Sequence, residues 1–170
     1  MKTKFLLLII SMLCSSLTYT QSNALNKLFE KYENEDDITI VNISKAMFNL
    51  MPGNIKTGNV DIKNIVPKIE SLRMITSDKS SLKEQMAVDF RSLVEKDKDY
   101  EELMRIKSGK SNITFNLKKK GDVINELVML VVDEEDFVVI QILGNFLLDD
   151  IKNIAEEAND TIIIPATSLK

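Results

Sequence analysis

Apolar and polar residues alternate along the second half of the chain in a pattern typical of β-strands. Within residues 113–118, apolar side chains alternate with Thr114, Asn116 and Lys118, which is the period of a half-buried strand. Three runs rich in β-branched and other apolar residues flank this segment, at 100–107, 123–132 and 137–143. Turn-forming clusters separate the four runs, so the pattern predicts an antiparallel meander.

The first half of the chain mixes helical and strand periods. Apolar residues at helical spacing predict helices over 23–32, 44–51, 61–66 and 81–94, the last beginning with the capping-box pattern Ser81-Leu82-Lys83-Glu84. Strands are expected at 38–43 and 70–77. After the meander, a closing helix is expected from Gly144 to Ala158, followed by a tail at 161–170 that either adds an edge strand or is loosely held.

These elements predict the α+β class. We expect a largely antiparallel sheet of about six strands that ends in the four-stranded meander, with the helices mainly on one face.

The N-terminus has the features of a secretory signal peptide. Lys2 and Lys4 precede the apolar run 5–13, and small polar residues follow it. The run is shorter than the roughly 20 apolar residues of a membrane span, so no retained span is expected. Leu13 directly before Cys14 does not fit the small residue that precedes a lipidated cysteine in bacterial lipoproteins. We therefore expect a signal peptide at 1–20 and a single domain at 21–170, exported to the periplasm or the extracellular space.

Composition excludes several classes of site. The only cysteine lies within the predicted signal peptide, and the chain contains no histidine. The mature domain would therefore have no disulfide, no thiol nucleophile, no imidazole base and no Cys or His ligands for zinc, copper or haem. The formal net charge is −4, and loss of Lys2 and Lys4 makes it about −6, which disfavours binding to polyanions such as nucleic acid.

The remaining candidate motifs have structural explanations. The acidic clusters 33–37 and 133–136 lack the spacing of a calcium loop, and Asp149-Asp150 is explained by the first turn of a helix. A basic group on 105–120 has few aromatic residues to stack nucleotide bases, and no glycine-rich phosphate loop is present. No catalytic, cofactor-binding or metal-binding residue is predicted, and no cofactor is expected.

Three segments together resemble a known family. They are Leu28-Phe29-Glu30-Lys31-Tyr32, the run from Thr39 to Phe48, and Leu72-Arg73-Met74-Ile75, preceded by the signal peptide. This order of features resembles the exported Bacteroidetes proteins grouped as domain of unknown function 4252. The resemblance implies one secreted domain and supplies no catalytic or binding residues.

By elimination, the favoured function is a non-catalytic interaction or signalling-associated domain of the cell envelope, with an envelope protein as its partner. The candidate interaction face carries Thr114, Asn116 and Lys118, which we expect on the wet side of the sheet, away from the helices; an open sheet edge is the other candidate. The alternatives are a small enzyme that uses carboxylate or lysine chemistry, and a module that binds a small ligand or calcium.

Overall fold

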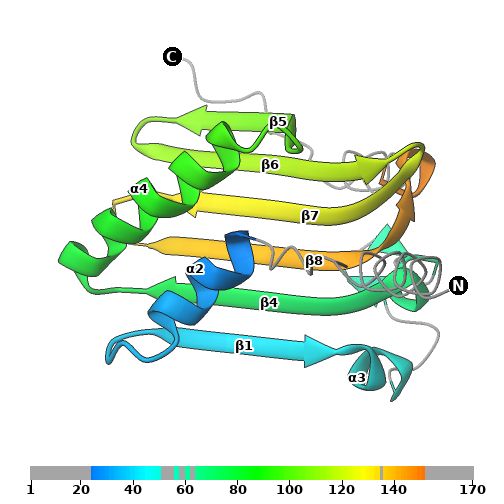
Figure 1. Ribbon diagram of the computed structural model, residues 1–170, viewed down its shortest axis with the longest axis horizontal. Helices are drawn as coiled ribbons and strands as arrows, with labels where there is room; N and C mark the ends of the chain where they lie inside the picture. The colour runs from blue at the N-terminus through cyan, green and yellow to red at the C-terminus, as the bar shows by residue number, and fades with distance from the viewer. Residues whose placement is uncertain (1–23, 51–55, 58–59, 62–63, 135, 152–170) are drawn as a thin grey trace, which may run out of the picture.

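The chain folds around one antiparallel sheet of six strands, in the spatial order β1-β4-β8-β7-β6-β5 (Figure 1). The computed structural model describes residues 24–50, 56–57, 60–61, 64–134 and 136–151. The last four strands follow one another in the sheet as they do in the chain, so the predicted meander is confirmed. The strands are β1 (Thr39–Ser44), β4 (Ile69–Ser77), β5 (Glu101–Ser108), β6 (Ser111–Lys120), β7 (Val123–Val132) and β8 (Phe137–Leu147).

Two helices lie on one face of this sheet, as expected for the α+β class. Helix α2 spans Ala24–Tyr32, helix α4 spans Ser80–Lys96, and both lie in front of the strands in Figure 1. We call this side of the sheet the helix face. The smaller elements are α3 (Lys45–Leu50), the two-residue strands β2 (Lys56–Thr57) and β3 (Val60–Asp61), and the 3-10 helix η2 (Val66–Lys68).

The main core lies between the helix face and the two helices. Phe90 of α4 is fully buried, and its ring centroid lies 5.6 Å from that of Phe29, 6.0 Å from that of Tyr32 and 5.9 Å from that of Phe137. The sheet contributes alternate residues, among them Ile75 and Val139. Because these positions pair in register across the strands, their side chains form one continuous apolar layer beneath the helices.

A second, smaller core lies at one end of the opposite face, which we call the second face. There Phe48 of α3 packs with Ile65, Ile69 and Phe146. Half-buried residues of the sheet, such as Leu72, border this core. Together the two cores give each face of the sheet some apolar cover, but the second face has cover from described residues at one end only.

Two predicted boundaries are wrong. Strand β8 continues through Gly144 to Leu147, and the helical residues follow it. A Cβ at Gly144 would lie 2.4 Å from the carbonyl oxygen of Lys68, so this glycine permits close packing within the strand rather than starting a helix. The predicted helix at 61–66 is also wrong: Asp61 belongs to β3, residues 64–65 form a turn, and the 3-10 helix η2 begins only at Val66.

The predicted capping box is absent as well. Helix α4 begins at Ser80 with Lys79 as its N-cap residue, and no side chain caps it. Predictions for the signal peptide at 1–20, the closing helix beyond Ile151 and the tail at 161–170 lie outside the described residues.

Candidate functional site

The three predicted interaction residues lie on the helix face. Thr114 pairs in register with Leu130, and Asn116 with Val128, both of which belong to the main core. Thr114 is 9% exposed and Asn116 is 6% exposed, so the expected exposure of these two side chains is wrong. The sequence predicts the wrong side for each set of residues. The polar set faces the helices, and the alternating apolar residues Ile113, Phe115 and Leu117 point to the second face.

Lys118, the third predicted residue, belongs to a polar network beside the end of α4. Its Nζ lies 2.7 Å from Oδ2 of Asp97 and 4.1 Å from the centroid of the Tyr100 ring. The Tyr100 hydroxyl and Nε2 of Gln141 each donate a 2.8 Å hydrogen bond to Oε1 of Glu126, which is almost fully buried. The network therefore ties three strands and the α4 terminus together.

The ion pair in this network helps to lower the pKa of the Asp97 carboxyl group. Burial alone would raise the pKa of the Asp97 carboxyl, but hydrogen bonds from Lys118 and from the backbone N–H of Asp99 lower that pKa below its ordinary value. The carboxylate is therefore charged at neutral pH and acts as a partner for the lysine rather than as a proton donor. We find a structural role for Lys118 in this arrangement.

The basic group on β5, β6 and their turns is largely neutralised by carboxylates. Four of its six cations are in ion pairs. The pairs are Arg105 with Glu102, Lys110 with Glu134, Lys118 with Asp97, and Lys119 with Glu101. These cations therefore make specific contacts with carboxylates instead of forming an open positive patch. In the turn between β7 and β8, the backbone N–H of Asp136 also donates to Oδ1 of Asp133.

An apolar row crosses the second face over all six strands. Each member lies directly opposite the next in the register of neighbouring strands, and residues opposite one another share a face. In spatial order the row is Val41, Met74, Ile140, Met129, Phe115 and Met104. Five of these side chains are half-buried, and Met104 is 45% exposed.

A second row runs beside the first and is also mainly apolar. It comprises Thr39, Thr76, Val138, Val131, Ile113 and Ile106. We call the two rows together the apolar stripe. At about 4.8 Å per strand the stripe is roughly 24 Å long, and two rows of side chains give it an area of roughly 300 Å². The largest apolar patch on a typical monomeric protein has about this size and is often functional.

The three methionines that share the stripe make its surface adaptable. Met74, Met129 and Met104 stand in one row, although they lie far apart in the sequence. Methionine side chains are flexible and polarisable, so a surface rich in them can accommodate partners of different shape.

A cleft lies at the end of the sheet near β5. It has a volume of about 520 Å³ and an apolar floor that includes Leu117, Ile124 and Leu147. Acidic residues from three segments surround this floor: Glu101, Glu102, Asp122 and Asp149. Among the described lining residues the one cation is Lys119, which forms a 2.9 Å ion pair with Glu101.

The residues that the structure describes contain no group of three or more acidic, histidine or cysteine side chains placed to hold a metal ion. Among these residues, no helix is both long and apolar enough to cross a membrane.

The fold and the stripe define a class of protein: a small α+β domain with one sheet face covered by helices and the other bearing an apolar surface. A search of curated proteins finds no match. The family model described as Domain of unknown function (DUF4252) matches residues 32–154, and the chain belongs to this family.

The stripe is not apparent from the sequence because the residues that form it are distributed over six separate strands. Each of the six strands contributes only two residues to it, and alternation within a strand does not say which set lies beneath the helices. The signal that could have pointed to it is the second half of β7, where Val128 to Val132 are all apolar. A strand that is apolar on both sides needs cover on both faces.

Proposed function

We propose that this protein is an exported, non-catalytic interaction domain that binds an amphipathic helix of an envelope protein on its apolar stripe. The observation that carries the proposal is the register itself, which aligns apolar side chains from all six strands on the face opposite α2 and α4. Sheets in α+β domains bury a face of this kind beneath another layer.

The size of the stripe favours a single helix as the occupant. A stable dimer that paired two such faces would need to bury about 800 Å² on each partner, well above the roughly 300 Å² available. A helix of about 16 residues is roughly 24 Å long, which equals the width of the six strands. The main core shows the same packing on the other face, where α4 crosses the strands (Figure 1).

Site-specific photo-crosslinking in intact cells tests the binding site. A benzophenone amino acid replaces Phe115, the member of the stripe on β6, and in a matched control it replaces Val88, which is 64% exposed on α4. We expect the Phe115 position alone to give an adduct, and mass spectrometry to locate the crosslink in an amphipathic helical segment of another protein. The proposal is wrong if Phe115 gives no adduct, or crosslinks only to this chain.

The export part of the proposal has its own test. N-terminal sequencing of protein purified from the envelope fraction should find a chain that begins near Gln21, because the charged, apolar and small polar regions of residues 1–20 fit a cleaved signal. A full-length cytoplasmic chain would overturn this part of the proposal.

The cleft beside β5 supports a second candidate function, the binding of a small amphipathic cation. Its volume and apolar floor suit such a ligand, and its acidic rim supplies complementary charge. A titration with small amphipathic amines, followed by amide chemical shifts, should perturb residues such as Gly121 and Leu148. Shifts spread evenly over the surface would argue against this site.

A further inference from the structure

Strand β5 forms an open edge of the sheet. It pairs with β6 on one side, and no described strand pairs with its other side. All eight of its residues are exposed, including Leu103 at 43%, Met104 at 45% and Ile106 at 45%. An open edge presents free backbone N–H and C=O groups to which another strand can be added.

The opposite edge of the sheet differs in length and chemistry. Strand β1 has six residues, and its exposed positions are the polar Thr39, Asn42 and Ser44. Helix α3 follows it directly and contacts it. Of the two edges, β5 is therefore the longer one and the one that exposes large apolar side chains.

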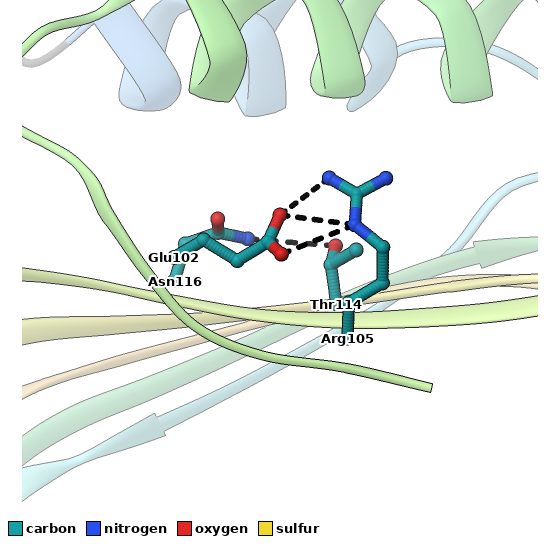
Figure 2. A network of polar contacts seen from close by, with 4 residues as sticks. All are labelled: Glu102, Arg105, Thr114 and Asn116. Atoms are coloured by element: carbon teal, nitrogen blue, oxygen red, sulfur yellow. Dashed lines mark hydrogen bonds and ion pairs between the residues drawn. The ribbon is translucent and has the colours of Figure 1, made fainter. Parts of the chain in front are cut away.

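Charge is distributed along β5 in a way that makes the strand complementary to itself. Its first two residues are Glu101 and Glu102, and its second half carries Arg105 and Lys107. Figure 2 shows Glu102 and Arg105 on the same side of the strand as the helices, with their charged groups directed toward each other; Nε of Arg105 lies 3.0 Å from Oε2 of Glu102. Antiparallel pairing with an identical strand would place each acidic half beside a basic half.

We propose that β5 pairs with β5 of a second copy about a two-fold axis, to give a continuous twelve-stranded sheet. A two-fold axis at Met104 places this residue opposite its own copy on the second face, whereas an axis one residue further on would place Arg105 opposite Arg105. Because Met104 belongs to the apolar stripe, the stripes of the two copies become continuous. This inference does not depend on the proposed binding of a helix.

The same charges have a competing explanation. Charged residues and bulges protect the edges of many sheets against association, and β5 has a bulge between Glu102 and Met104. The two explanations make opposite predictions for the wild-type chain. Protective charges keep it monomeric, whereas complementary charges hold two wild-type edges together, and strands that carry the same sign then separate.

A mixing experiment separates them. One variant of the full chain, Glu101→Lys with Glu102→Lys, has a basic β5, and a second variant, Arg105→Glu with Lys107→Glu, has an acidic β5. Sedimentation velocity should find a wild-type dimer that weakens with added salt, with each variant alone associating at least about tenfold more weakly. The equimolar mixture should restore the dimer.

Two further measurements make the outcome decisive. Thermal unfolding of each variant checks that the fold is retained, which we expect because all four positions are exposed. Met104→Ser should weaken the wild-type dimer without a change of charge. A wild-type protein that stays monomeric up to about 1 mM, or a mixture that remains monomeric while both variants are folded, overturns the proposal.

Discussion

The hydroxyl of Tyr100 donates a 2.8 Å hydrogen bond to Oε1 of Glu126, and so joins the residue before β5 to the middle of β7. Glu126 is 4% exposed, and burial of a carboxyl group is costly unless hydrogen bonds compensate it. Lys118 lies over the same tyrosine ring. This pair therefore links the polar part of the helix face to the edge of the sheet.

Replacement of Tyr100 by phenylalanine should lower the free energy of unfolding by about 1–2 kcal/mol, because it removes one donor from a buried carboxyl group. Urea denaturation at neutral pH measures the change. The variant keeps the ring beneath Lys118, so the ring contact serves as its own control. A change smaller than about 0.3 kcal/mol would contradict the role assigned to this hydrogen bond.

The stability of the α2–α4 contact should depend on pH through Asp89. Hydrogen bonds from Lys31 at 2.6 Å and from the Tyr32 hydroxyl at 2.7 Å hold the pKa of the Asp89 carboxyl below its ordinary value of 3.8. The unfolded chain therefore binds a proton at Asp89 more readily than the folded chain does. The stabilisation from the charged Asp89 carboxylate is present above the ordinary pKa and is lost as the pH falls through the pKa of this group in the folded protein.

Asp89→Asn tests this dependence. At pH 7 the variant should be less stable than the wild type, and the difference should shrink as the pH is lowered below about 4. Urea denaturation at several pH values measures it. A difference that stays constant over this range would show that the carboxylate charge is not the cause.

Adjacent valines in β8 test the assignment of the two faces. Val139 is fully buried beneath the helices, whereas Val138 is half-buried in the apolar stripe. Threonine has nearly the same shape as valine, so the substitution mainly adds a hydroxyl group. Val139→Thr should cost about 1–3 kcal/mol, and Val138→Thr less than about 0.5 kcal/mol. Equal costs in chemical denaturation would mean that both faces are equally covered.

Gly144 should tolerate no side chain. A Cβ there would lie 2.4 Å from the Lys68 carbonyl oxygen and 2.5 Å from the Phe146 ring, so Gly144→Ala forces backbone or ring movement at a cost of about 1–3 kcal/mol. Gly121→Ala is the matched control, with open space around it and a positive φ of 64°. It should cost about 1 kcal/mol, from backbone strain alone. Thermal unfolding measures the loss of stability in both variants, and a smaller loss for Gly144→Ala than for Gly121→Ala would contradict the predicted clash.

Local patterns predicted most strands well. The run from Val123 to Val132 was expected as a strand and is β7 in full, because β-branched residues and flanking turns act over a few neighbouring positions. The end of β8 was missed for a non-local reason. Gly144 looks like a helix start in the sequence, but the strand continues because Gly144 pairs with Ile69 of β4 and Phe146 pairs with Ile124 of β7.

The candidate interaction residues show the same limit of local sequence patterns. Apolar and polar residues alternate along 113–118, and this alternation predicts that the polar set, Thr114, Asn116 and Lys118, lies on the exposed side. In the structure Thr114 and Asn116 are buried on the helix face. Tyr100, Gln141 and Glu126 form a hydrogen-bonded cluster on that same face, so polar residues of β6 do not need to face solvent.

The sequence by itself determined the elements: strands from two-residue periodicity, helices from apolar spacing, and the absence of histidine or thiol chemistry from the predicted mature domain. Only the tertiary structure decided which side of each strand the helices cover, and hence that Met74, Met129 and Met104 align in one apolar row. The physical reason is that alternation is local to a strand, whereas the register between strands and the docking of α2 and α4 depend on contacts between residues far apart in the chain.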